Sequence, residues 1–493
     1  MIILYNPPSS PQHKPVLPMS LLALGAVLEG AHAYRIIDGN IESDPLASIL
    51  KAIDVDRATI LAVTVMPGPQ LSHAVPLCRS IRAMRPDVVI IWGGYFPSQH
   101  YEACLNSGYV DYVVRGHGEM VFKKLVDTLA HGEVPANMAG LVMRSASEAA
   151  PALQINPPAA IPHPDQLPDF PYHRVDMERY IRPTFMGSRT IPHHSSYGCP
   201  FFCNFCAVVN MVNGRWLAQS AERVAAITAR LVKEWGVNAV DFYDNNFFTH
   251  EARVAEFAER ITPLHIGWWG EGRIDTLMHY SDATWEKMRL SGLRMVFLGA
   301  ESGSNETLKR MNKGGAASTE KTLAIARKMK DYGIVPELSF VVGNPPDPQA
   351  DMNHTKEFIR KVKQINQAAE IILYMYTPVP LAGELYEQAR AQGFRFPETL
   401  EAWVSPEWIS FSQRHSAHMP WLNEVLRRDI GDFQRVLNAY YPTSTDIHMS
   451  RLKRLTLRSV AAWRYHLQMY RHPFELRALN RLLAYQRPET SGF

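Results

Sequence analysis

Short apolar runs and amphipathic segments of helical period alternate through most of this sequence, and one proline-rich stretch interrupts them. Eight prolines fall between residues 149 and 183, and this composition is typical of an extended connection between domains. Strand–helix alternation on both sides of the stretch predicts parallel sheets covered by helices. With 493 residues, the chain is also too long for one ordinary core. The sequence therefore predicts α/β domains in succession.

Residues 1–140 are expected to form a doubly wound, flavodoxin-like parallel sheet. Its expected strands are Met1–Tyr5, Ile60–Val65, Val88–Trp92 and Asp111–Val114. Glycines follow three of them closely, at Gly68, at Gly93-Gly94 and at Gly116. Such sheets bind ligands at the carboxyl ends of their strands, and glycine lets a ligand approach the backbone closely.

Residues 141–185 are assigned to the linker, 186–395 to a second α/β domain, and 396–493 to a helical C-terminal region. Six strand–helix units predict a partial (β/α)6 barrel with its site at the carboxyl ends of the strands. The expected strands of this barrel are His194–Tyr197, Ala239–Tyr243, Gly267–Glu271, Met295–Gly299, Glu337–Val342 and Glu370–Tyr376.

Three of the five cysteines lie within one short loop that follows the first expected barrel strand. Cys199, Cys203 and Cys206 can converge on iron, and three ligands would leave one iron of a 4Fe–4S cluster open for chemistry. The alternatives are a zinc site or core cysteines, although zinc usually takes four ligands and no second cysteine pair exists here. The remaining two, Cys78 and Cys104, are expected to be core residues.

This CxxxCxxC loop resembles the hallmark of the radical S-adenosylmethionine family, in which the open iron binds the cofactor and a 5′-deoxyadenosyl radical abstracts hydrogen from substrate. The segments that end the later expected strands resemble family segments as well, including Gly299–Gly303, which is similar to G-x-E-S-G. The resemblance implies that Cys199, Cys203 and Cys206 hold the cluster. It also implies cofactor contacts for Phe205, Asn245, Arg273, Glu301 and Ser302. It assigns no catalytic residue.

The first domain resembles the cobalamin-binding domain that precedes many radical enzymes of this kind. The resemblance implies that cobalamin contacts Ser20, Leu21, Gly68, Gly93, Gly94, Tyr95, Arg115, Gly116 and Glu119. There is no D-x-H-x-x-G segment, so the histidine that ligates cobalt in cobalamin mutases is absent. His117 is a substitute in principle, but a loop histidine more often makes an ordinary hydrogen bond. A degenerate domain that holds no corrinoid is the alternative.

With both cofactors, the resemblance implies methylation of an unactivated carbon. A second hypothesis is radical-initiated cyclisation or oxidation of an apolar or tetrapyrrole-like substrate, as in the anaerobic magnesium-protoporphyrin ester cyclase. A third is a cobalamin or iron–sulfur sensor that does not turn over. Since no cysteine follows Cys206, a methyl-cysteine mechanism and auxiliary clusters are excluded.

The net charge of +3 gives no case for nucleic acid binding. We expect a cytoplasmic protein, because the N-terminus does not resemble a secretory signal and no apolar stretch approaches the ~20 residues that span a bilayer. The expected partners are a small-molecule substrate and a one-electron reductant such as flavodoxin or ferredoxin. From Arg451 onward nine Lys and Arg residues face two acids. This pattern fits a solvated helical face or a basic amphipathic surface that touches anionic lipid.

Overall fold

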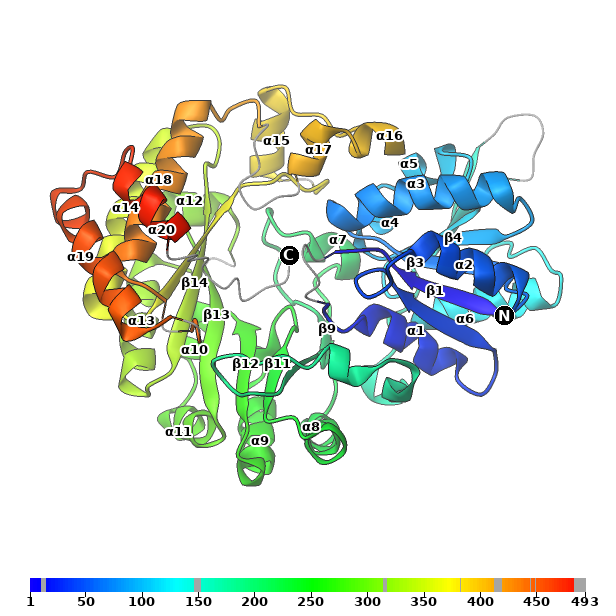
Figure 1. Ribbon diagram of the computed structural model, residues 1–493, viewed down its shortest axis with the longest axis horizontal. Coiled ribbons are helices and arrows are strands. Elements are labelled where there is room, and N and C mark those ends of the chain that lie inside the picture. The colour runs from blue at the N-terminus through cyan, green and yellow to red at the C-terminus, as the bar shows by residue number, and fades with distance from the viewer. Residues whose placement is uncertain are drawn as a thin grey trace.

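Two α/β domains lie side by side in the computed structural model, and the short strand β9 (Ser196–Gly198) and helix α7 (Val208–Val212) lie between them (Figure 1). The structure describes residues 1–9, 15–145, 152–313, 317–381, 383–411, 419–443, 445–447 and 449–482. Within this part of the chain, no helix is long and apolar enough to span a membrane.

The first domain is built on a seven-stranded sheet with the order β2-β1-β3-β4-β5-β6-β7. The first five strands of this order are parallel, and their arrangement is the flavodoxin-like one. Its strands are β1 (Ile2–Asn6), β2 (Tyr34–Asp38), β3 (Ile60–Thr64), β4 (Val89–Gly93), β5 (Tyr112–Val114), β6 (Leu141–Arg144) and β7 (Leu153–Ile155). Its helices are α1 (Met19–Leu28), α2 (Pro45–Asp54), α3 (Pro69–Met84), α4 (Tyr95–Gln99), α5 (Tyr101–Asn106) and α6 (Glu119–Ala130).

This sheet runs past residue 140, where the sequence placed the start of the linker. Strands β6 and β7 add to the edge at β5 in antiparallel orientation. Leu141 and Val142 are fully buried, so they extend the core of the first domain. Most of the proline-rich segment follows β7, and this part holds three short 3-10 turns at Pro164–Gln166, Tyr172–Arg174 and Met177–Arg179. Residues 146–151 of the expected linker lie outside the described residues.

The second domain contains six parallel strands in the order β15-β14-β13-β12-β11-β8, which confirms the expected partial (β/α)6 barrel. The strands are β8 (Thr190–His193), β11 (Ala239–Phe242), β12 (Gly267–Gly272), β13 (Leu293–Glu301), β14 (Val335–Val342) and β15 (Glu370–Met375). The helices are α8 (Ala221–Trp235), α9 (Glu251–Ile261), α10 (Ile274–Met278), α11 (Asp282–Leu290), α12 (Asn305–Arg310), α13 (Thr319–Asp331) and α14 (Pro348–Ile365).

The first barrel strand is β8, and the expected strand at His194–Tyr197 is wrong. The chain leaves the sheet after His193, because the Asp244 carboxylate accepts hydrogen bonds from the Ser195 amide and from the hydroxyls of Ser195 and Ser196, at 2.6, 2.6 and 2.7 Å. It then forms β9, which pairs with β10 (Trp216–Ala218) in a separate two-stranded sheet. The cysteine loop therefore follows this small sheet, not the barrel strand.

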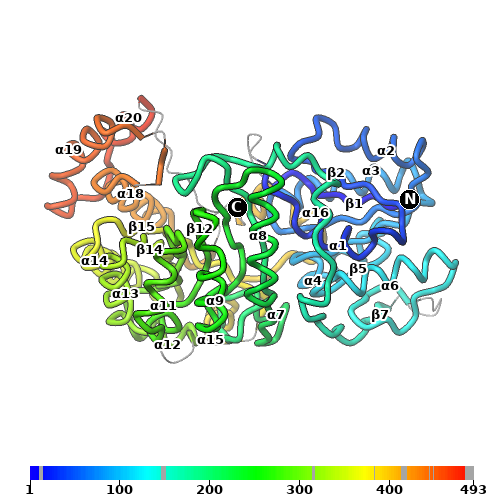
Figure 2. Tube along the Cα trace, turned by 90° about the horizontal axis from the view of Figure 1, so that it is seen from below, coloured from blue at the N-terminus to red at the C-terminus, as the bar shows by residue number. Residues whose placement is uncertain are grey.

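The helical C-terminal region divides into two parts. Helices α15 (Glu384–Ala391), α16 (Leu400–Trp403) and α17 (Pro406–Phe411) reach back toward the first domain, where Trp403 packs edge-on against Phe96 with ring centres 5.1 Å apart. Helices α18 (Glu424–Tyr440), α19 (Arg451–Leu467) and α20 (Phe474–Leu482) lie at the end of the molecule opposite the first domain (Figures 1 and 2).

Candidate active site

A cavity of about 310 Å³ lies at the carboxyl edge of the first sheet. Its walls come from the ends of β3, β4 and β5, from α1 and from the loop before α6. Among the residues expected to contact cobalamin, those that line it are Ser20, Gly93, Gly94, Gly116 and Glu119. Phe170, His194 and Tyr197 from the following segments also line the cavity, so it lies at the boundary between the domains.

The other four expected residues are not among those that line this cavity. Leu21 is fully buried in the core, and Gly68 is the N-cap that precedes helix α3, with φ of 85°. The Arg115 guanidinium lies 4.8 Å from the centre of the Tyr101 ring. Tyr95 faces the cysteine loop, where burial and the nearby Cys206 thiol raise the pKa of its hydroxyl.

Gly94 is required by the backbone at the rim of the cavity. Its φ is 99°, and an added Cβ would lie 3.1 Å from the Val65 amide and carbonyl. Any other residue would therefore strain the end of β4. Gly93 differs, because an added Cβ would meet nothing nearer than 3.8 Å and its φ lies outside the left-handed region.

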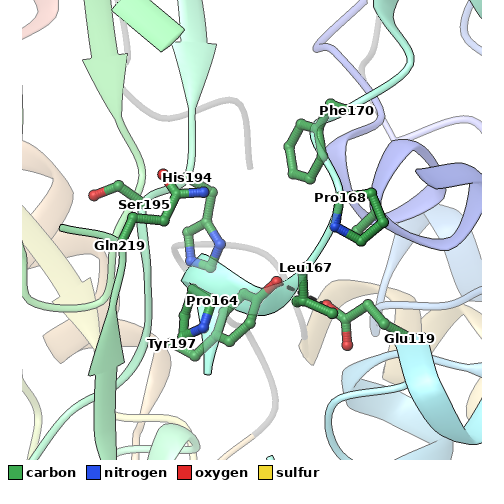
Figure 3. Close-up of a pocket in the computed structure, with 10 residues that line it drawn as sticks. Glu119, Pro164, Leu167, Pro168, Phe170, His194, Ser195, Tyr197 and Gln219 are labelled. Atoms are coloured by element: carbon green, nitrogen blue, oxygen red, sulfur yellow. Dashed lines mark hydrogen bonds between the residues drawn. The ribbon is translucent and has the colours of Figure 1, made fainter. Parts of the chain in front are cut away.

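Tyr197 joins the two domains directly at this cavity. Its hydroxyl donates a hydrogen bond of 2.8 Å to Glu119 Oε1, from β9 to the first residue of α6 (Figure 3). Its ring centre is 4.3 Å from that of His117 and 5.4 Å from that of His194. Burial and the Glu119 carboxylate raise the pKa of Tyr197, so this hydroxyl remains a donor.

The second oxygen of Glu119 is buried and has no hydrogen-bond partner within the described residues. Because an unpaired buried oxygen is costly, it marks a place for a donor supplied by a ligand. A corrinoid carries amide groups around its ring, and these can donate such a bond. The glycine edge and this oxygen fit the part of a bound cobalamin that enters the cavity, and the rest of so large a molecule would extend into the boundary between the domains.

The three cysteines follow β9 and lie beside the same boundary. Cys203 is 7% exposed, and burial together with the neighbouring Cys203 and Cys199 thiols raises the pKa of Cys206 to about 12. No three His, Cys, Asp or Glu side chains in the described ranges are placed to hold one metal ion. Each ligand of a 4Fe–4S cluster binds a separate iron, so three cysteines of one loop fit such a cluster with one iron open.

Arg273 lies next to the cysteine loop and is held from several sides. Its Nη1 is 3.4 Å from Cys203 Sγ, and its guanidinium makes two hydrogen bonds to Asp275, at 3.0 and 2.8 Å. Its Cζ lies 3.7 Å from the centre of the Phe201 ring. A fixed cation in this position stabilises thiolates and the negative charge of a cluster.

Glu301 ends β13 at a bulge, in the left-handed conformation with φ of 63°. Its carboxylate pairs with Lys313 Nζ, which also donates a 2.6 Å hydrogen bond to the Gly299 carbonyl. Sequence analysis missed Lys313, which no motif singled out. An added Cβ at Gly299 would lie 1.9 Å from Glu301 Oε1, so a side chain there would displace this ion pair.

The remaining expected residues have other surroundings. Asn245 is exposed, and its neighbour Asn246 is the buried residue whose Nδ2 lies 3.8 Å from Cys199 Sγ. The asparagine beside the cysteine loop is therefore one position later in the loop after β11 than expected. Ser302 is fully buried and donates to Asp351 Oδ1 at 3.3 Å, so its hydroxyl has a structural partner. Phe205 packs partly buried against the core.

Carboxyl groups line the face of the second sheet that lies away from its covering helices. Trp268 packs against Phe257 of α9, so Glu271, three positions later, faces the other way. Glu271, Phe297 and Glu337 occupy one row across β12, β13 and β14. Burial, together with the Glu337 and Asp244 charges, raises the pKa of Glu271 to about 8. This carboxyl therefore holds a proton near neutral pH.

Two family models match the chain, the B12 binding domain over residues 14–126 and the radical SAM superfamily over residues 194–359. An uncharacterized methyltransferase of Pyrococcus horikoshii is 27% identical over 73% of this chain and 78% of its own. The anaerobic magnesium-protoporphyrin IX monomethyl ester cyclase of Synechocystis is 24% identical over 74% of this chain and 72% of its own.

The fold is similar to that of the radical S-adenosylmethionine methyltransferase TsrM from Kitasatospora setae, solved with tryptophan and a cofactor analogue. The TM-score is 0.67 at 17% identity, over 98% of this chain and 99% of that one. The two family models follow each other in the order of the two sheets, and each covers most of the parallel strands of its sheet. The chain therefore belongs to the radical S-adenosylmethionine enzymes that carry an N-terminal B12-binding domain.

Proposed function

We propose that this protein methylates an unactivated carbon of a small-molecule substrate. The observation that carries the proposal is the Tyr197–Glu119 hydrogen bond, which joins the strand before the cysteine loop to the wall of the cavity in the first domain. Hydrogen abstraction and methyl delivery need two sites that face one substrate, and this contact brings the two candidate sites to one boundary.

The residues divide into three groups. Cys199, Cys203 and Cys206 would hold the iron–sulfur cluster, with Arg273 beside Cys203. Asn246 and the Glu301–Lys313 pair border the same loop and would contact S-adenosylmethionine. The cavity residues Ser20, Gly93 and Glu119 would hold cobalamin. When bound, these cofactors supply a hydrogen-abstracting radical and a methyl group.

The chain itself orients the reactants and keeps water out. Phe170 of the proline-rich segment and His194 after β8 close the cavity on the side of the second domain. Phe170 also lines a second, smaller pocket together with Pro164, Leu167 and Pro168, so this segment is part of the wall (Figure 3). A closed boundary protects a reactive carbon centre from side reactions.

The protonated Glu271 carboxyl offers a hydrogen-bond donor on the inner face of the second sheet, where the family's substrates react. An oxygen or nitrogen acceptor of the substrate would pair with it. The net reaction replaces one hydrogen of the substrate by a methyl group and consumes two molecules of S-adenosylmethionine. One of these ends as 5′-deoxyadenosine and methionine, and the other as S-adenosylhomocysteine. This balance needs two electrons in each turnover, which a flavodoxin or ferredoxin would supply.

The test uses protein reconstituted with iron, sulfide and cobalamin without oxygen, given S-adenosylmethionine and a low-potential reductant. Methyl transfer predicts one 5′-deoxyadenosine and one S-adenosylhomocysteine for each methylated product. Candidate substrates are screened by mass for a gain of one methyl group. Deoxyadenosine without S-adenosylhomocysteine would favour the cyclisation or oxidation chemistry named in the Synechocystis relative. Neither product would favour a sensor.

A further inference from the structure

The outer surface of the C-terminal helices carries a concentration of exposed apolar side chains. Eight large hydrophobic residues between positions 447 and 482 are at least 45% exposed. They include Leu452, Leu455, Trp463 and Leu467 on α19 and Phe474 and Leu482 on α20. Isolated exposed hydrophobic residues are ordinary, whereas a concentration of them marks an interaction surface.

Helix α19 is apolar on two opposite sides. Leu457, Ala461 and Tyr465 are buried and follow one another at four-residue spacing, so they form the inner stripe. Leu452, Leu455 and Trp463 have the spacing of a second stripe about half a turn away from the first. The inner stripe fixes the helix to the protein, and the outer stripe of Leu452, Leu455 and Trp463 stays exposed.

Positive charge accompanies this apolar stripe. Residues 447–482 contain eight Lys and Arg residues and one acid, Glu475, whereas the whole chain has a net charge of only +3. Arg464 is buried and paired with Glu475, and Arg471 and Arg477 reach Asp429 and Asp432 of α18. Arg451, Arg458 and Arg481 are exposed.

A groove of about 290 Å³ borders the outer stripe beside α19. Leu455 stands in its wall together with Arg454 and Arg458, and Lys363, Tyr440 and Tyr441 line the other side. Its one acidic residue, Glu370, is buried and accepts a 2.8 Å hydrogen bond from the Thr443 hydroxyl. Arg454 Nη2 donates a 3.2 Å hydrogen bond to the Asp446 carbonyl, while its Nε is buried without a hydrogen-bond partner in the described ranges. This groove offers cations to an anionic group, with apolar side chains next to them.

We propose that the outer face of α19 and α20 docks on a membrane that carries anionic lipids. The apolar stripe would enter the interface between headgroups and acyl chains, as amphipathic helices do. Arg454 and Arg458 would bind a headgroup phosphate in the groove, and the remaining cations would face the negative surface. This face lies at the far end from the first domain, so docking leaves the candidate active site uncovered (Figures 1 and 2).

The experiment is sedimentation of the full chain with phospholipid vesicles. We expect binding to vesicles of phosphatidylcholine with one quarter phosphatidylglycerol, weaker binding at 500 mM salt, and little binding to pure phosphatidylcholine. Leu452→Ser combined with Leu455→Ser should weaken binding about tenfold or more. Arg454→Gln combined with Arg458→Gln should weaken it by about five-fold for each charge.

The matched control is Val134→Ser combined with Leu290→Ser, which removes two exposed apolar side chains elsewhere on the surface. Circular dichroism checks that all variants keep the fold. An equal loss in the control, or no preference for anionic vesicles, would overturn the proposal. It would also be overturned if the leucine variants abolish self-association instead, which would identify a second copy as the occupant. If vesicles bind only after residues 483–493 are removed, the occupant of this face is the chain's own terminus, and the proposal is overturned.

Discussion

The Tyr197 hydroxyl donates a 2.8 Å hydrogen bond to Glu119 Oε1 across the boundary between the two domains. Tyr197 precedes the first cysteine of the loop by two residues, and Glu119 begins helix α6 in the first domain. The Tyr197 ring is packed against the rings of His117 and His194. This contact therefore joins the cavity of the first domain to the strand that precedes the cysteine loop.

Tyr197→Phe should destabilise the apo protein by about 2 kcal/mol, because Glu119 would be left with both oxygens buried and unpaired. Glu119→Gln keeps a side-chain oxygen that can accept the Tyr197 hydrogen bond, so the loss in free energy of unfolding should be smaller. The free energy of unfolding in urea, measured for both single variants and for the double variant, gives the coupling between them. A coupling below about 0.5 kcal/mol would show that the bond is energetically unimportant.

Cys203→Ala should abolish the visible absorbance of the iron–sulfur cluster and leave the circular dichroism unchanged, because Cys203 lies in a loop and not in a strand or helix. Iron and sulfide content after anaerobic reconstitution provide the measurement. Cys104→Ala is the control, since its thiol is buried in the first domain. Iron content that is unchanged in Cys203→Ala would disprove the assignment of this ligand.

Gly93→Phe should prevent cobalamin loading by filling the cavity, and Gly93→Ala should load almost normally. An added Cβ at Gly93 meets only the Val114 carbonyl at 3.8 Å and the Val114 Cβ at 4.0 Å, so the backbone tolerates a side chain there. A substitution at Gly94 would strain the backbone and confuse the result. Bound corrinoid is read from its absorbance after desalting, and equal loading of both Gly93 variants would place the corrinoid elsewhere.

Glu271→Gln should stabilise the second domain progressively as the pH rises. The pKa of Glu271 is raised from 4.5 to about 8, so between these values the folded chain keeps a proton that the unfolded chain releases. The stability of the parent protein therefore falls with rising pH, by about 1.4 kcal/mol per unit. Glu271→Gln carries no titrating proton at this position, so its stability does not fall with pH in this way.

The measurement is the urea midpoint of the parent and of Glu271→Gln at pH 5, 7 and 9. The difference should grow with pH up to about 8 and then level off. Glu259→Gln is a control, because Lys287 holds the pKa of that exposed carboxyl below its usual value, which gives no gain at high pH. A difference independent of pH would contradict the raised pKa.

Sequence alone predicted the parts of the fold that depend on local periodicity. The strand–helix units located four of the five parallel strands of the first sheet and five of the six barrel strands, whereas β2 was missed. The first barrel strand was misplaced, because the signal that ends it is the side chain of Asp244, about fifty residues away in the chain. The alternation of strands and helices does not predict antiparallel edge strands such as β6, because the tertiary fold decides which strand they pair with.

The site was predictable where a motif names the residue. The cysteine spacing marked the loop, and G-x-E-S-G marked Glu301. Lys313 was missed because it pairs with Glu301 only after α12 folds back toward the end of β13. The asparagine near Cys199 is Asn246 and not the expected Asn245. Adjacent residues of a loop point in different directions, and hydrophobic periodicity does not show which of the two faces the cysteines.

The first domain contacts the rest of the chain at three separated places, one of which is the Tyr197–Glu119 hydrogen bond. The proline-rich segment leaves it on one side, where the Tyr180 hydroxyl donates to Asp38 at 2.9 Å, and Trp403 of α16 packs on Phe96 and His100 on another. A body held at one point can swing open, whereas contacts at three separated places must break together before the two domains part. Separation of the two domains therefore costs all three contacts at once.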